Sequence, residues 1–359
     1  MTGKAVTDTA VNEEKLHAFV GHVVEDFGAA LSSILGYMGQ KMGLYTALRD
    51  AGSVTPVEFA KHTGLAERYL REWLLNQAAG GYVAYDAATG RYHLPPEQAV
   101  ALTDDSSPFY VGGGFYVIKA MLQAQPRISE AFRSGGGMFW GEHDPDLFVG
   151  TERFFRPGYA THLTRAWIPA LSGVEKKLQA GAKVADVGCG HGASTIIMAQ
   201  AYPASRFWGF DSHEASVEYA REEAVKAGVS DRVTFEVIEA AHIPPKGFDL
   251  VCFFDCLHDM GRAVEACQRA YAALAPEGSV LLVEPMAGHR VEENFNPIGR
   301  TFSAASTLCC TPNALAHGGP ALGTLATDQQ LAETLRAGGF TRFRRAAETP
   351  FNRIFEARR

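Results

Sequence analysis

A buried strand followed by a glycine-rich turn, Lys183–Thr195, constrains the fold of this chain more than any other stretch. Residues 184–187 form the short, mostly apolar run of a parallel strand that is covered on both faces. Gly188, Gly190 and Gly192 then lack Cβ atoms at alternate positions, so the backbone can turn sharply and a ligand can approach its amides. An apolar helix start follows, which predicts a strand–turn–helix unit.

The turn fits two classes of cofactor. Residues 188–193 satisfy the loose dinucleotide pattern G-x-G-x-x-G/A, and residues 186–192 have the D/E-x-G-x-G-x-G form of enzymes that bind S-adenosylmethionine (SAM). A second strand, Phe207–Phe210, ends in Asp211, about 20 residues past the glycines, where a carboxylate can accept hydrogen bonds from ribose hydroxyls. The alternative without a ligand is a tight turn with an N-capping Asp.

The composition indicates a globular protein of two or three domains. The chain has 359 residues, 47% of them hydrophobic and 20% charged, and its net charge of -7 opposes binding to a phosphate backbone. Met1–Thr9 is small and polar, unlike a secretory leader, and no apolar run approaches the ~18 residues of a membrane span. We therefore expect a cytoplasmic protein with no nucleic-acid or membrane partner.

The six cysteines lie at positions 189, 252, 256, 267, 309 and 310, and none has a usual zinc spacing. Buried thiols in a reducing cytosol are therefore expected, with no bound metal. The vicinal pair Cys309 and Cys310 is interpreted as packing rather than redox chemistry.

The N-terminal residues 12–37 predict a long amphipathic helix, with apolar side chains at steps of three and four. Such a face needs a partner, either its own domain or a second subunit. We expect the second, and hence a homodimer, because the stripe spans many turns ahead of an otherwise compact module.

A winged helix follows within an expected N-terminal domain of residues 1–100. Thr55–Glu58 is a helix-start signature with a proline at the first helical position, and Ala66–Ala79 predicts a second helix. Residues 82–85 and 91–94 flank a Gly-closed loop and predict a hairpin. The second helix is expected to bury the apolar residues Tyr69, Leu70, Trp73 and Leu74.

The charge of this winged helix disfavours DNA as its ligand. Between Lys41 and Pro95 there are six basic and five acidic residues, and the acidic residues of the would-be recognition helix offset its arginines. Phosphate neutralisation would be poor, so a structural or dimerising role is expected.

Residues 101–172 are rich in aromatic side chains and glycines, and predict connecting helices and loops that cover a pocket in the next domain. Arg156 and Tyr159 are candidate substrate contacts in this segment. The alternative is that the aromatic side chains form interdomain core.

Strand and helix patterns alternate through residues 173–359, which predicts an α/β domain with a doubly wound, Rossmann-like parallel sheet and a site beyond the carboxyl ends of its strands. Residues 340–346 and 351–357 predict a closing antiparallel hairpin, a departure from a simple NAD-binding sheet. Residues 285–325 form an insertion after the fifth strand, expected to be a long loop over the substrate, with Asn294 as a candidate contact.

Taken together, these features resemble class I SAM-dependent methyltransferases with an N-terminal winged-helix domain. The similarity is closest to bacterial, mycobacterial-type members and more distant to the small-molecule O-methyltransferases of plants and polyketide pathways. It rests on Ala185–Gly192, Gly209–Asp211, Phe254–Asp259 and the terminal hairpin, and it covers most of the chain.

The resemblance implies cofactor contacts at the ends of the strands. Gly188 and Gly190 would lie against the methionyl part and ribose of SAM, and Asp186 would help to hold its amino group. The remaining contacts would be Asp211 with Ser212 at the ribose, Glu239 and Ala240 at the adenine, and Phe254 and Asp255 beside the sulfonium. Carboxylates and an aromatic face both favour such a cation.

His258 and Asp259 are the candidate catalytic pair, because they follow the fourth strand at the ligand edge. They resemble the His-Asp of plant-type O-methyltransferases, in which the histidine is the base. The next residue is Met260 rather than the usual Trp, and Phe254 replaces a common Lys. The alternative is a histidine that caps the helix starting near Gly261.

The sequence therefore predicts a SAM-dependent methyltransferase that acts on a small, aromatic or apolar acceptor by O-methylation and releases S-adenosyl-L-homocysteine. An NAD(P)-dependent oxidoreductase and a SAM-sensing winged-helix transcription regulator are the alternatives. The acceptor, the methylated atom and the oligomer size do not follow from these residues.

Overall fold

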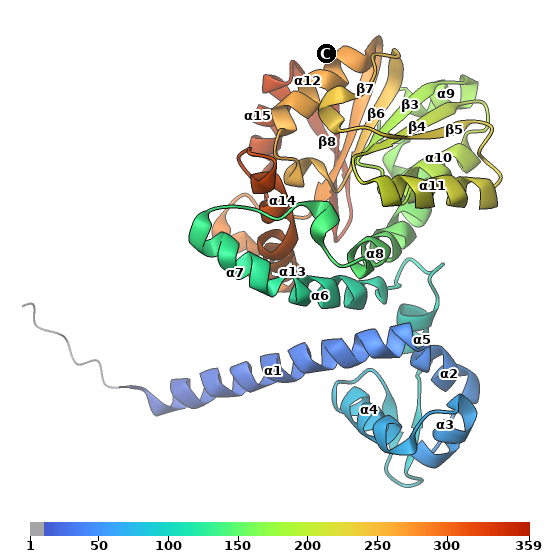
Figure 1. The fold of residues 1–359 in the computed structure, drawn as a ribbon, viewed down its shortest axis with the longest axis vertical. Helices are drawn as coiled ribbons and strands as arrows, with labels where there is room; N and C mark the ends of the chain where they lie inside the picture. The colour runs from blue at the N-terminus through green and yellow to red at the C-terminus, as the bar shows by residue number, and fades with distance from the viewer. Residues whose placement is uncertain (1–10) are drawn as a thin grey trace, which may run out of the picture. The chain divides into compact units, whose positions relative to one another are not determined.

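The chain divides into two compact units, Met1–Asp104 and Asp105–Arg359, in a computed structural model that describes residues 11–359 (Figure 1). Met1–Thr9, in which we expected no leader, lies outside the described residues.

The first unit is a helical domain with a two-stranded wing, as the sequence predicts. The Thr55 hydroxyl accepts from the Glu58 amide, and the Glu58 carboxylate accepts from the Thr55 amide at 2.8 Å, so the expected capping box begins α3. Phe59 and Leu74 are completely buried in the core between these helices. The elements are α1 (Glu13–Lys41), α2 (Leu44–Ala51), α3 (Pro56–Thr63), α4 (Glu67–Ala79), β1 (Ala84–Asp86), β2 (Arg91–His93) and α5 (Pro96–Thr103).

Helix α4 differs from the prediction at one apolar position. Leu70, Trp73 and Leu74 are buried, but Tyr69 is 82% exposed, so its expected burial is wrong. Consecutive helical residues point about 100° apart, and the core contacts the side of α4 that carries Leu70.

Helix α1 presents much of its apolar stripe to solvent within this unit. Phe19, Phe27 and Leu31 are each more than 60% exposed, and Asn12 caps the helix by accepting from the Lys15 amide at 2.9 Å. By length and composition alone, α1 is also apolar enough to cross a membrane, although no uninterrupted apolar run has that length.

The second unit contains a seven-stranded sheet in the order β5-β4-β3-β6-β7-β9-β8. Neighbouring strands from β5 to β7 are parallel, while β9 is antiparallel to β7 and to β8, which confirms the doubly wound sheet with a closing hairpin. The strands are β3 (Lys183–Val187), β4 (Arg206–Asp211), β5 (Val233–Val237), β6 (Phe248–Phe254), β7 (Leu274–Pro285), β8 (Arg342–Glu348) and β9 (Asn352–Arg358).

Helices cover both faces of this sheet, which explains why its central strands carry apolar residues on both faces. Along β3, Val184 packs into the core on one face and Ala185 into the core on the other; Leu250 and Val251 divide in the same way along β6. The helices are α6 (Gly113–Gln123), α7 (Gln125–Ser134), α8 (Asp146–His162), α9 (Val174–Ala180), α10 (Ala193–Ala201), α11 (Glu214–Lys226), α12 (Ala263–Ala273), α13 (Pro297–Ala305), α14 (Thr311–Ala316) and α15 (Asp328–Ala337). Shorter helical turns are η1 (Trp140–Glu142), η2 (Leu163–Trp167), η3 (Ala240–His242), η4 (Leu257–Asp259), η5 (Val291–Asn294) and η6 (Ser306–Cys310).

The insertion after β7 is helical, so the expectation of a long loop is wrong. It holds η5, α13, η6 and α14, and its first helix has a side-chain cap, because Asn296 accepts from the Gly299 amide at 2.9 Å. Prolines at 297 and 312 occupy the first turns of α13 and α14, where a missing amide hydrogen costs nothing.

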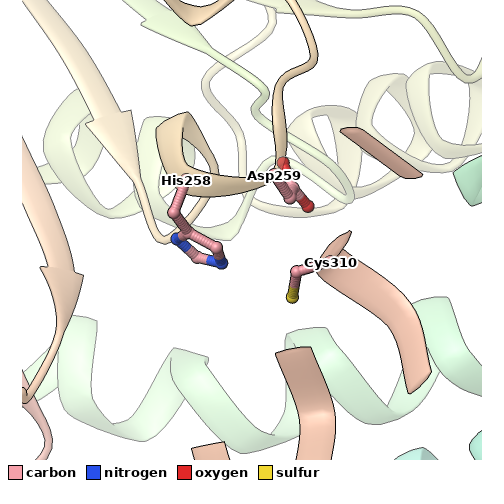
Figure 2. Close-up of side chains that lie close together, drawn as sticks. All are labelled: His258, Asp259 and Cys310. Carbon is pink, nitrogen blue, oxygen red and sulfur yellow. The ribbon is translucent and has the colours of Figure 1, made fainter. Parts of the chain in front are cut away.

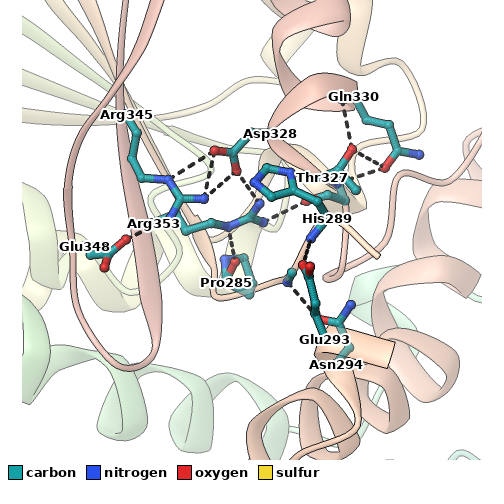
Figure 3. Close-up of polar contacts among 12 residues, drawn as sticks. Pro285, His289, Glu293, Asn294, Thr327, Asp328, Gln330, Arg345, Glu348 and Arg353 are labelled. Atoms are coloured by element: carbon teal, nitrogen blue, oxygen red, sulfur yellow. Dashed lines mark hydrogen bonds and ion pairs between the residues drawn. The ribbon is translucent and has the colours of Figure 1, made fainter. Parts of the chain in front are cut away.

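A buried arginine ties this insertion to the terminal hairpin (Figure 3). Arg353 donates to the Pro285 and Ala326 carbonyls at 2.8 and 2.7 Å, and to the Asp328 carboxylate at 2.8 Å. Arg345 binds the same carboxylate. The two ends of the insertion are therefore held at the sheet, which fixes where its helices can lie.

Candidate functional site

A cavity of about 220 Å³ opens beyond the carboxyl ends of β3, β4 and β6. Ten of the residues predicted from the sequence line it, and they come from five separate segments. They are Tyr159, Gly188, Gly190, Asp211, Ser212, Glu239, Ala240, Phe254, Asp255 and Asp259. The parallel sheet brings them together because its strands all end at this edge.

The glycine turn forms the floor of the cavity. Gly190 has a φ of +50°, and a Cβ added there would meet no atom within 4 Å, so only the absence of a side chain keeps this space open. Gly188 has a φ of +73°, and a Cβ there would lie 2.8 Å from the Cys256 Sγ, so a side chain does not fit.

Three consecutive amides of this turn donate within the protein. The amides of Gly188 and Cys189 donate to the Phe210 carbonyl at 2.8 and 3.1 Å, and that of Gly190 donates to Asp211 Oδ2 at 2.8 Å. A phosphate-binding turn needs such amides free to point at the anion. The amides of Gly188, Cys189 and Gly190 are therefore not free to bind a dinucleotide pyrophosphate.

Asp211 stands at the end of β4 with both oxygens held by backbone amides. Its Oδ1 accepts from the His213 amide at 2.9 Å, while Oδ2 accepts from Gly190. Burial raises the pKa of Asp211 despite these hydrogen bonds, which lower it. Each carboxylate oxygen still has a second lone pair, so the group can accept further hydrogen bonds from a ligand.

Asp186 lies under the turn and does not line the cavity. Its Oδ2 accepts from the Ser194 and Thr195 hydroxyls, each at 2.6 Å, while Oδ1 is buried and has no partner among the described residues. Burial raises the pKa of Asp186 to about 6. A negative charge without a counter-charge thus sits below the cavity floor.

Among the residues that the structure describes, Asp255 is the one residue other than glycine with a positive φ, which is +50°. Its carboxylate accepts from the Tyr159 hydroxyl at 3.1 Å and from Asn352 Nδ2 at 2.6 Å. Burial, with a contribution from the Glu284 charge, raises the pKa of Asp255 to about 7. A strained backbone held in this way is typical of a functional site.

His258 lies beside the cavity rather than in its wall. The ring is 2% exposed, and its Nδ1 lies 2.6 Å from Oε2 of the completely buried Glu284. Burial lowers the pKa of His258, but the charge of Glu284 and the contact with Cys310 outweigh it, and the pKa lies well above its ordinary value. The alternative that His258 caps a helix is wrong, because α12 begins at Ala263 with no side-chain cap.

Two predicted substrate contacts do not reach the cavity. Arg156 forms ion pairs with Asp105 at 2.8 Å and with Glu152 at 3.3 Å. Asn294 is bound within its own turn, accepting from the Gly288 amide and donating to the Arg290 carbonyl. Both side chains are used to hold local structure, so the prediction that they line the site is wrong.

The covering wall contains residues that the sequence did not single out. Trp140 and Phe148 pack on each other at 5.5 Å between ring centroids, and Phe155 lies 6.1 Å from Tyr159 with its ring nearly parallel. His317 also lines the cavity. The aromatic density of residues 101–172 signalled such a wall, but not which rings face the ligand.

Carboxyl groups are frequent in the wall of the cavity. Five carboxylates line it. Arg262 is the arginine among the lining residues that the structure describes, and it is already paired with Glu239 at 3.1 Å. Carboxylates in a partly desolvated space favour a cation and oppose an anion. The five are Glu152, Asp211, Glu239, Asp255 and Asp259.

Comparison with known families divides the chain in the same way as the fold. Residues 178–337 match a methyltransferase domain, and residues 29–104 match an Rv2258c-like winged HTH domain.

Two curated relatives match part of the chain. The 27-O-demethylrifamycin SV methyltransferase of Amycolatopsis mediterranei (strain S699) is 34% identical over 139 residues, which is 36% of this chain and 51% of the relative. The trans-aconitate 2-methyltransferase of Paracidovorax citrulli (strain AAC00-1) is 32% identical over 108 residues, 30% of this chain and 40% of the relative. The chain thus spans about half, or less, of the length of these relatives.

Solved structures are similar over nearly the whole chain. Mitomycin 7-O-methyltransferase has a TM-score of 0.74 at 18% identity, covering 97% of this chain and 100% of that one. Human N-acetylserotonin methyltransferase in complex with SAM has a TM-score of 0.69 at 16% identity, covering 99% of each chain. The fold is therefore that of SAM-dependent methyltransferases, with an N-terminal winged-helix domain.

Proposed function

We propose that this chain transfers the methyl group of SAM to a hydroxyl of a small aromatic or apolar molecule and releases S-adenosyl-L-homocysteine. The observation that carries the choice of cofactor is the hydrogen bonding of the glycine turn. Its amides are engaged with Phe210 and Asp211, and the cavity above them is lined by carboxylates. A sulfonium with an ammonium group suits that environment, and the pyrophosphate of NAD(P) does not.

The proposed orientation of SAM follows the position of the polar groups. The ribose hydroxyls would donate to the free lone pairs of Asp211, near Ser212, and the adenine would lie beside Glu239 and Ala240. Gly188 and Gly190 would contact the methionyl part, with Asp186 below its ammonium. Phe254 and Asp255 would lie beside the sulfonium, where Asp255 is held by Tyr159. These groups supply alignment and charge stabilisation.

The acceptor side is proposed to be the aromatic wall. Trp140, Phe148 and Phe155 offer apolar ring surface opposite the glycine turn, which favours a flat, weakly polar acceptor.

His258 is proposed as the base, with Asp259 beside it. Methyl transfer forms an oxygen–methyl bond, breaks the sulfur–methyl bond and leaves the acceptor proton for a base to remove. Glu284 fixes the ring through Nδ1 and helps to raise its pKa, so the ring acts as a base only after it has lost its own proton. Nε2 then takes the proton of the acceptor. His317 is the competing candidate, because its ring lines the cavity directly.

A homodimer through α1 and the winged-helix unit is proposed for the first unit. The exposed apolar residues of α1 need cover, and the arginines of α4 offer little to DNA, since Arg68 pairs with Glu72 and Arg71 with Glu67. A cytoplasmic location is proposed from the six cysteines, all of them free. The transcription-regulator alternative would require DNA retention that falls with salt.

Cofactor choice is tested by titration calorimetry with S-adenosyl-L-homocysteine, its 2′-deoxy analogue and NAD(P). We expect the ribose form to bind wild-type protein at least about tenfold more tightly than the deoxy form, and the two to bind Asp211→Ala equally. Comparing the two nucleosides within one variant separates ribose recognition from damage to the turn, which Asp211 also holds. Binding of NAD(P) in preference to the homocysteine nucleoside would refute the proposal.

A further inference from the structure

Three side chains with metal-ligand chemistry converge beside the cavity. We propose that His258, Asp259 and Cys310 bind a divalent cation of the zinc class. A ring nitrogen of His258, a carboxylate oxygen of Asp259 and the Cys310 Sγ all lie within 4.8 Å of one another. Figure 2 shows the three side chains turned toward a common space, two from η4 and one from the facing end of η6.

The donor set selects the metal. One nitrogen, one oxygen and one sulfur suit zinc, whereas magnesium and calcium prefer oxygen ligands alone. Bonds of about 2.0 to 2.3 Å to a tetrahedral ion place neighbouring ligand atoms about 3.5 Å apart. The separation of at most 4.8 Å therefore closes with side-chain rotations, which the half-buried Asp259 and Cys310 can make.

The surroundings of His258 independently match those of a metal-bound histidine. Such histidines usually hold a carboxylate through the ring nitrogen that does not bind the metal, which fixes the tautomer and the ring orientation. Here Glu284 lies 2.6 Å from Nδ1, so Nε2 is the nitrogen left to bind the ion. Glu284 Oε1 is buried without a partner among the described residues, so this carboxylate keeps an unused acceptor beside the ring.

Hydrogen bonds hold together the two segments that supply the ligands, η4 and the end of η6. Asn313, one turn beyond Cys310, donates to the backbone carbonyl of Asp259 at 3.1 Å and accepts from the Trp140 amide at 2.9 Å. The Gly323 amide donates to the His258 carbonyl at 3.1 Å. The site is thus pre-organised by the backbone, which limits the cost of closing it on an ion.

Three protein ligands leave a fourth position on a tetrahedral ion. Because Asp259 lines the cavity, water from the cavity can fill that position. The ion would take the His258 Nε2, the nitrogen that the proposed function assigns to the acceptor proton. Metal occupancy and base catalysis therefore exclude each other at this ring. The site itself does not depend on methyl transfer, and its test needs no turnover.

The test is direct binding of Zn²⁺ and Co²⁺ to the tag-free full chain. Calorimetry is expected to give one Zn²⁺ per chain, and Co²⁺ to give the charge-transfer absorption of a cysteine-bound ion. Cys310→Ser should abolish that absorption and weaken Zn²⁺ binding at least about tenfold. Cys309→Ser is the matched control, because the neighbouring thiol is not among the three ligand atoms.

Asp259→Asn provides a second, half-buried variant, and its Zn²⁺ affinity should fall while the Co²⁺–sulfur absorption persists. Thermal unfolding of each variant without metal shows that it is folded. Zn²⁺ binding that is absent from the wild-type protein, or unchanged in Cys310→Ser, would overturn the proposal. A Co²⁺–sulfur signal lost in Cys309→Ser and kept in Cys310→Ser would do the same.

Discussion

Replacing Asp186 with asparagine removes a charge that the protein buries without a counter-charge. The residue is completely buried, and its pKa is raised by burial from 3.8 to about 6. A shift of that size corresponds to about 3 kcal/mol of folding free energy at neutral pH, since each pKa unit is worth about 1.4 kcal/mol. Asparagine keeps an acceptor for Ser194 and Thr195, so the hydroxyl hydrogen bonds need not be lost.

The sign of the pH dependence follows from the raised pKa. Below about pH 4, Asp186 holds its proton in both the folded and the unfolded chain, and the stabilising contribution is fully present. Between about pH 4 and pH 6 the unfolded chain ionises first, so wild-type protein loses stability as the pH rises. The variant has no such loss. It is expected to match wild type near pH 4 and to exceed it by up to about 3 kcal/mol at pH 8.

Urea unfolding from pH 4 to pH 8, followed by circular dichroism, measures this difference. Calorimetry with SAM on the same variant measures the loss of cofactor affinity. We expect this loss to be at least about tenfold, because the cationic cofactor no longer compensates a buried charge. Ser194→Ala is the control, since it removes one hydroxyl bond and leaves the carboxylate. A stability gain that is equal at pH 4 and pH 8, or unchanged SAM affinity, would refute the reasoning.

Three further outcomes are expected. His258→Gln should lower kcat by about 10² to 10⁴ with homocysteine-nucleoside affinity unchanged, whereas a larger loss in His317→Gln would move the base to that ring. Gly192→Ala should cost about 1 to 3 kcal/mol in urea unfolding, because its Cβ would lie 2.6 Å from Phe235 Cζ at a φ of +79°. Phe19→Asp, on the exposed stripe of α1, should convert a dimer to a monomer in light scattering; a monomeric wild type would contradict the interface.

The sheet followed from the sequence because each strand is specified locally. Strand β6 (Phe248–Phe254) is apolar apart from Asp249, and the chain turns polar at Asp255, directly after the strand. The winged helix could also be predicted from local sequence. Thr55 and Glu58 are three residues apart and form a capping box, which marks the start of a helix.

The cavity wall was less accessible, because tertiary structure creates it. Trp140 lies far along the chain from Asn313 and His317, and a single sequence carries no signal for their convergence. The insertion was expected to be a loop from its length, and the helix-start signal of Pro297 and Pro312, which sit in first helical turns, was not used.

The same glycine spacing serves anionic and cationic ligands, so the spacing cannot decide between them. What decides is the destination of the amide hydrogens. Had the Gly190 amide pointed into the cavity, a carboxylate at the end of β4 would have competed with a phosphate for it. Instead that amide donates to Asp211, so it is not free to bind a phosphate. A phosphate could use this amide only if its hydrogen bond to Asp211 were broken, whereas a sulfonium nucleoside needs no such change.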